Sequence, residues 1–214
     1  MVVPKRETYR HGDLRRALLE AGTRLAKAGG PTAVVLREAT RQAGVAPNAA
    51  YRHFADRDAL LQAVCSAAQA ELALAIEAEW ASCPTTGKPA DIARAHLRAV
   101  GTGYLRFARA EPGLFRTAFS VHEDLQKATI PEMAGKSGLT PFQLLTRALD
   151  EMCEAGVLLA ERRFGAEFLA WSAVHGLSML LIDGPLRVLN DEQAEGIGAQ
   201  LLEMVERGLP QPDK

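Results

Sequence analysis

Two short helical segments separated by a glycine turn limit the possible folds more than any other feature of the sequence. Residues 36–43 place apolar side chains at helical spacing and end at Gly44, a residue that readily adopts the left-handed conformation of a helix C-terminus. Pro47 suits the first position of the next helix, where its missing N–H is not needed, and we expect that helix to end near Phe54. Two short helices joined by a three-residue turn predict a helix-turn-helix, whose second helix enters a major groove.

Longer helices are predicted on both sides of this unit. Residues 13–28 carry apolar positions at helical spacing, and Gly29-Gly30-Pro31 ends the pattern. Asp56 is a suitable N-cap for a long helix that continues to about Ile76.

The remainder of the chain is also predicted to be helical. Ala, Leu, Arg and Glu outnumber the β-branched and aromatic residues, and hydrophobic residues make up 48% of the chain, which together favour an all-α protein with a proper core. Thr140, Pro141 and Gln143 form a capping-box pattern. We expect helices over 90–110, from Pro112 through Phe119, over 140–156, over 165–183 and from Asn190 onward, with a loop or frayed helix over 121–139.

Charge is distributed unevenly although the net charge is only −1. The first 62 residues carry a net charge of +5, and the rest of the chain carries −6. A basic N-terminal module on an acidic body predicts that the first part meets a polyanion, whereas charge alone also fits a merely solvated surface.

The central motif closely resembles the DNA-binding signature of TetR-family transcriptional regulators. Residues 36–61 read LREATRQAGVAPNAAYRHFADRDALL, in which the Ala-Gly-Val turn, the Tyr-x-His-Phe segment and the Leu-Leu pair are the most family-specific parts. The resemblance covers roughly residues 10 to 62. It implies a three-helix DNA-binding domain over residues 1–55, joined by a long fourth helix to an effector-binding and dimerisation domain over residues 56–214.

The resemblance also implies roles for individual residues. Tyr51 and His53 are expected to contact backbone phosphates, as is Arg57, which stands where the family often has a lysine. Asn48 and Arg52 are the polar side chains left on the recognition helix, and these residue types suit adenine and guanine. The predicted DNA contacts are Arg37, Asn48, Ala49, Tyr51, Arg52, His53 and Arg57. The alternatives are core packing for Tyr51, a surface position for His53 and solvated charges for the arginines.

Three positions depart from the usual family pattern. Val35 and Ala46 stand where a Ser or Thr commonly caps the second and third helices, which removes a side-chain partner for an orphan N–H at each. Thr40 occupies a buried position that is usually Ala, and we expect its hydroxyl to bond to a carbonyl one turn earlier.

The C-terminal part resembles the Trp-His-Gly type of ligand-binding domain of one branch of TetR-like proteins. The resemblance rests on residues 104–108 (YLRFA), on 112–116 (PGLFR) and on Trp171-x3-His175-Gly176-Leu177. It implies an apolar effector pocket in the helical body, for which Tyr104 and His175 would orient a hydrophobic or planar small molecule. The predicted pocket residues are Tyr104, Phe107, Phe119, Met152, Trp171, His175 and Met179. A satisfied core histidine is the alternative for His175.

The last two helices are predicted to form a subunit interface. Residues 165–183 are apolar on nearly every side, so we expect that helix to be buried on nearly every side. The final helix is expected to turn Ile197, Leu201, Met204 and Val205 inward. Pairing between two subunits gives a four-helix interface in a homodimer, and a strictly monomeric core is the alternative.

Other functional classes find little support. Gly135-Lys136-Ser137 lacks the earlier glycine of a phosphate-binding loop, and no catalytic motif or metal-ligand spacing is present, so we expect neither an enzyme nor a cofactor. The three cysteines have no C-x-x-C spacing and are expected to be reduced. With no secretory signal and only a short apolar run over 168–182, we expect a cytoplasmic protein without a membrane partner.

Together these features predict a homodimeric, ligand-responsive DNA-binding regulator, and a repressor in particular. Its partners would be double-stranded DNA with a near-palindromic operator and a small apolar or planar effector. The alternative is a non-transcriptional interaction protein that uses the helix-turn-helix only as a packing unit.

Overall fold

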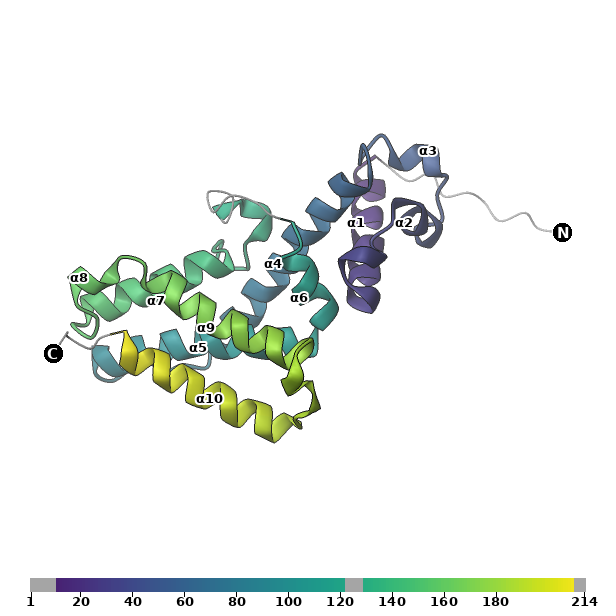
Figure 1. Ribbon diagram of the computed structural model, residues 1–214. Coiled ribbons are helices and arrows are strands. Elements are labelled where there is room, and N and C mark those ends of the chain that lie inside the picture. Colours follow the sequence, from purple (N-terminus) through teal and green to yellow (C-terminus); the bar gives the residue numbers. More distant parts are fainter. Residues whose placement is uncertain (1–10, 122–128, 210–214) are drawn as a thin grey trace.

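The computed structural model describes residues 11–121 and 129–209, and every regular element in these two ranges is helical. Figure 1 shows a small module of short helices at one end and a larger helical body at the other. The elements are α1 (His11–Gly29), η1 (Pro31–Ala33), α2 (Leu36–Gln42), α3 (Pro47–Ala50), α4 (Arg57–Trp80), α5 (Pro89–Ala110), α6 (Pro112–Ala118), η3 (Pro131–Met133), α7 (Pro141–Glu154), α8 (Ala160–Arg163), α9 (Ala166–Ile182), η4 (Pro185–Val188) and α10 (Asp191–Gly208). The predicted all-α class is confirmed, whereas α8 and the three short 3-10 helices were not expected.

The helix-turn-helix forms as predicted, with a shorter second helix. Gly44 has a φ of 68°, the left-handed value that the turn after α2 requires. The α-helix of α3 ends at Ala50 rather than near Phe54. Its last turn is tight because the amides of His53 and Phe54 both donate to the Ala50 carbonyl, each at 2.9 Å. Ala50 and Phe54 are buried and hold the module together.

The atypical positions behave as their side chains dictate. Neither Val35 nor Ala46 caps its helix through a side chain. The Thr40 hydroxyl donates to the Arg37 carbonyl at 2.7 Å, which confirms the predicted bond to the preceding turn.

Helix α4 connects the two parts of the molecule (Figure 1). Its start is fixed by Asp56, whose Oδ1 accepts a hydrogen bond from the Ala59 amide at 2.8 Å, as the sequence predicts. Within the described ranges α4 is long and apolar enough in composition to cross a membrane. Leu60, Leu72 and Ile76 are fully buried, as in the core helix of a folded protein, whereas Leu74 is 38% exposed.

In the body, α5 and α7 pack against α4, while α9 and α10 pack against α5 and against each other. Helices α4 and α5 approach closely at Gly103, where a Cβ atom would lie 2.6 Å from the Ile76 Cα. The capping boxes of Thr140 with Gln143 and of Asn190 with Gln193 form, so the predicted starts of α7 and α10 are confirmed.

Of the two predictions about the C-terminal helices, one is wrong for the single chain and the other is wrong at one residue. Helix α9 leaves an apolar strip exposed, with Leu169 67% and Leu180 44% accessible. Helix α10 packs Ile197, Leu201 and Val205 against the core as predicted, but Met204 is 61% exposed. The buried acid Glu206 was not expected on the inward face of α10.

Candidate nucleic-acid interface and ligand cavity

The recognition helix presents its polar and aromatic side chains to solvent. Asn48 and Arg52 are exposed, and Tyr51 is 57% exposed although it is a large aromatic residue. Tyr51 therefore does not pack into the core beside the buried Phe54. Arg37 on α2 is also exposed, whereas Ala49 and His53 are half-buried.

Arg57 has a structural role that the sequence did not reveal. Its guanidinium donates to the Val34 carbonyl at 3.1 Å and to the Pro31 carbonyl at 2.7 Å, and it lies 3.2 Å from Asp58. These bonds tie the start of α4 to the segment between α1 and α2. A phosphate bound by Arg57 would have to share a guanidinium that already holds two backbone carbonyls.

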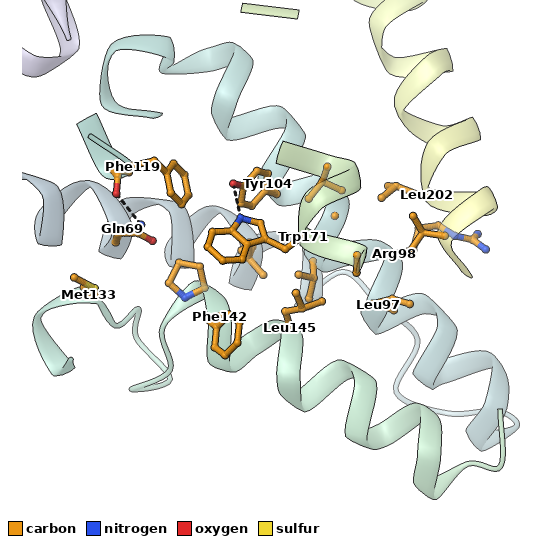
Figure 2. Close-up of a pocket in the computed structure, with 18 of the residues that line it drawn as sticks. Gln69, Leu97, Arg98, Tyr104, Phe119, Met133, Phe142, Leu145, Trp171 and Leu202 are labelled. Atoms are coloured by element: carbon orange, nitrogen blue, oxygen red, sulfur yellow. Dashed lines mark hydrogen bonds between the residues drawn. The ribbon is translucent and has the colours of Figure 1, made fainter. Parts of the chain in front are cut away.

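A cavity of about 360 Å³ lies within the body, which is far more than one buried water needs. Figure 2 shows its aromatic centre, with Tyr104 and Trp171 beside each other and Phe119 and Phe142 nearby. Of the predicted pocket residues, Tyr104, Phe119 and Trp171 line this cavity.

The other four predicted pocket residues lie outside the lining. Phe107 and Met152 are buried in the surrounding core. Met179 is 36% exposed on the outside of α9. His175 lies behind the wall, with its ring centroid 4.9 Å from that of Phe119.

Much of the lining was not anticipated as a pocket. The further lining residues are Cys65, Gln69, Ile76, Leu97, Arg98, Val100, Gly101, Ala118, Val121, Met133, Pro141, Phe142, Leu145, Ala170, Val174, Leu202, Val205 and Glu206. Helical periodicity places Phe142 and Leu145 on the inner face of α7, and that signal could have found them. Nothing in the local sequence distinguishes Arg98 from a solvated arginine.

Three side chains at the cavity wall satisfy one another. The Trp171 indole N–H donates to the Tyr104 hydroxyl at 3.1 Å, and that hydroxyl lies 2.8 Å from His175 Nδ1. Because the indole can only donate, the Tyr104 oxygen accepts there, and the tautomer of His175 sets the direction of the second bond. Burial lowers the pKa of His175. Burial also raises the pKa of Tyr104, opposed by the bond from Trp171, so the network is uncharged at neutral pH.

Helix α6 joins the cavity to the N-terminal module. Ala118 and Phe119, at its C-terminal end, line the cavity. At its other end Gly113 packs against the end of α1, where a Cβ atom would lie 2.3 Å from the Ala26 carbonyl oxygen. Beside this contact the Lys27 ammonium of α1 lies 3.3 Å from Glu71 of α4 and 3.2 Å from Glu111. A change in the wall of the cavity therefore has a short packed route to α1.

Two family models match the chain. The model described as bacterial regulatory proteins, tetR family, matches residues 18–64, and the model described as tetracyclin repressor-like, C-terminal domain, matches residues 97–205. None of the curated proteins compared with the chain matches it.

Solved structures share the fold over nearly the whole chain. A protein of unknown function from Rhodococcus sp. RHA1 is 26% identical, with a TM-score of 0.73, over 96% of this chain and 100% of its own. A regulatory protein of the tetR family from Rhodococcus RHA1 is 19% identical, with a TM-score of 0.61, over 94% and 98% of the two chains. RolR in complex with resorcinol is 16% identical, with a TM-score of 0.59, over 95% and 96%.

Proposed function

Because this chain belongs to the tetR family of bacterial regulatory proteins and is a DNA-binding transcriptional regulator, we propose that it is a repressor that a small molecule releases from its operator. The family is not generally enzymatic, and we assign the chain no catalytic role. We place it in the cytoplasm, where its DNA partner lies, without a membrane partner. The alternative of a non-transcriptional interaction protein has no observation in its favour.

The observation that carries the proposal is the exposed surface of α3 and of the turn directly after it. Tyr51, Arg52 and Asn48 project into solvent there, while Ala50 and Phe54 hold the helix to its module. In a major groove these exposed side chains would reach phosphates and base edges. The proposed DNA-binding set also includes Arg37, Ala49, His53 and Arg57. Arg57 in addition holds the module together through its bonds to two backbone carbonyls.

We propose a homodimer formed through α9 and α10. Leu169, Leu180 and Met204 are exposed apolar side chains on these two helices, and a second copy would cover them. Two recognition helices related by a two-fold axis require a near-palindromic operator, with half-sites about one helical turn apart or a multiple of it. The division into residues 1–55 and 56–214 is part of this proposal, as is the Trp-His-Gly subtype of the C-terminal domain.

The effector would occupy the cavity at Tyr104, Phe119 and Trp171. Its lining of aromatic and aliphatic side chains suits an apolar or planar molecule. The complex of RolR with resorcinol is a case in which a protein of this fold holds a small planar ligand. A ligand can release DNA only if it binds more tightly to the arrangement that does not fit the operator. Helices α4 and α6 connect the cavity to α1 and would carry that difference.

The test is selection of fragments from a genomic pool by the purified protein, followed by binding measurements on the selected site. Arg52→Ala and Asn48→Ala are expected to weaken binding by about 1–3 kcal/mol or to relax base preference. Arg187→Ala is the matched control, because Arg187 is exposed on η4 in the body. Affinity is also expected to fall steeply with salt, with a log–log slope near −0.9 per phosphate contact. Operator affinity that changes neither with salt nor with Asn48→Ala and Arg52→Ala would refute the proposed DNA-contacting surface.

A further inference from the structure

The cavity differs sharply between its two ends. Figure 2 shows Gln69 and Met133 at one end and Arg98 with Leu202 at the other, with Trp171 between them. Among the lining residues in the described part of the chain, the only charged side chains are Arg98 and Glu206. A ligand that fills the cavity would therefore meet charge at one end only.

The charged end carries an excess of positive charge. Glu206 of α10 is 8% exposed, and its carboxylate lies 2.5 Å from the Arg98 guanidinium and 3.4 Å from that of Arg94. A buried carboxylate is stable only when it is paired, and here one carboxylate serves two guanidiniums. The group as a whole has a net charge of +1. The Arg98 side chain is 56% exposed, so this group lies at the solvent end of the cavity, and its excess positive charge favours an anion there.

The middle of the cavity offers a ligand few polar partners. The Trp171 N–H and the Tyr104 hydroxyl are hydrogen-bonded to each other, and the hydroxyl is also bonded to His175, which lies outside the lining. Gln69 donates one amide N–H to the Ala118 carbonyl at 2.9 Å and keeps a second N–H and its amide oxygen for a ligand. Away from Gln69 the body of a ligand must then be largely apolar, because a polar group placed there would lose water without gaining a partner.

We infer that the cavity takes an elongated amphipathic carboxylic acid, with an apolar acyl or aromatic body among the aromatic residues and its carboxylate at Arg98. This inference rests on the proposed function and names the class of effector. Arg98 is suited to the role because a guanidinium binds a carboxylate through two parallel hydrogen bonds. Glu206 already pairs with Arg98, so a ligand carboxylate would share that guanidinium with Glu206 and be repelled by it. Since Glu206 belongs to α10, such a ligand would also weaken a contact of the proposed interface helix.

The experiment is calorimetric titration of the full-length protein with matched acids and neutral compounds. The pairs are decanoate with 1-decanol and 2-naphthoate with its methyl ester, each below its aggregation concentration. At least one acid is expected to bind 10- to 100-fold more tightly than its neutral match, the range of a charge-assisted pair. Arg98→Gln should remove this preference without weakening the neutral compound, and Glu206→Gln should strengthen binding of the acid by removing its competitor.

Arg106→Gln is the matched control, because Arg106 lies on the same helix but pairs with Glu79 outside the cavity. Circular dichroism on each variant verifies that it is folded. The inference would be overturned if neither acid bound more tightly than its neutral match, or if Arg98→Gln weakened the acid and the neutral compound equally.

Operator binding measured with each compound separates this inference from the proposed function. Neutral compounds that release DNA as well as acids do would leave the proposed function standing and remove the ligand class. Acids that bind through Arg98 without releasing DNA would support the ligand class and contradict the proposed function.

Discussion

Replacing Tyr104 with phenylalanine tests the hydrogen-bonded network at the cavity wall. The hydroxyl accepts from Trp171 and shares a second hydrogen bond with His175, and Tyr104 itself is only 5% exposed. Tyr104→Phe removes both bonds while keeping the ring and its packing against Phe115. Each bond contributes about 0.5–1.5 kcal/mol net, and two partners are left unpaired at once, so we expect a loss of about 2 kcal/mol in the free energy of unfolding.

Urea denaturation followed by circular dichroism measures this loss. With a slope of about 2 kcal/mol per molar urea, the midpoint should fall by about 1 M. Tyr51→Phe is the matched control: Tyr51 is 57% exposed, and its stability effect should stay within about 0.5 kcal/mol while its operator affinity falls. A Tyr104→Phe protein as stable as the parent would mean that the hydroxyl network contributes nothing, and our account of a cavity with satisfied donors would be incorrect.

Three other predictions follow from the structure. Burial lowers the pKa of His175, so as the pH falls the unfolded chain binds a proton at His175 before the folded protein does. The free energy of unfolding should therefore decline below about pH 6.5. His175→Gln should flatten this part of the stability profile. Burial alone would raise the pKa of Glu77, but hydrogen bonds from Ser137 and Lys136 outweigh burial and lower the pKa. The ionised Glu77 should therefore stabilise the protein at neutral pH, and this stabilisation should decrease in acid. Glu77→Gln should speed amide exchange over residues 135–139 without changing exchange in α3. A Cβ atom at Gly176 would have free space in the single chain, so Gly176→Ala should stabilise a monomeric protein by about 1 kcal/mol. In the proposed dimer the same substitution should weaken association, as measured by sedimentation equilibrium. A dimer of unchanged affinity would argue against packing at that position.

Local signals predicted most helix boundaries. Asp56, Thr140 and Asn190 each cap a helix through a backbone N–H three residues ahead, so the whole interaction lies within the pattern that the sequence displays. The end of α3 was harder to predict, because two amides share the Ala50 carbonyl and no residue type marks such a turn. The four-residue α8 is too short for helical periodicity to establish.

The candidate sites were predicted unevenly, because their residues depend on contacts at different ranges. Tyr104 and Trp171 were found because they belong to a recognisable pattern. Glu206 was not, because a buried acid is possible only when Arg94 and Arg98, more than a hundred residues away, are folded against it.

The exposed strip on α9 gives the opposite lesson. Its composition predicts burial on nearly every side, yet Leu169 and Leu180 are exposed in the single chain. Burying one such side chain stabilises a protein by about 1.5–3 kcal/mol relative to leaving it in water. A second surface that covers the whole strip would therefore be strongly favoured. Met204 on α10 is exposed in the same way, and α9 and α10 pack against each other. The disagreement between composition and single-chain burial therefore supports the proposed two-fold interface, and with it the paired recognition helices that a near-palindromic operator requires.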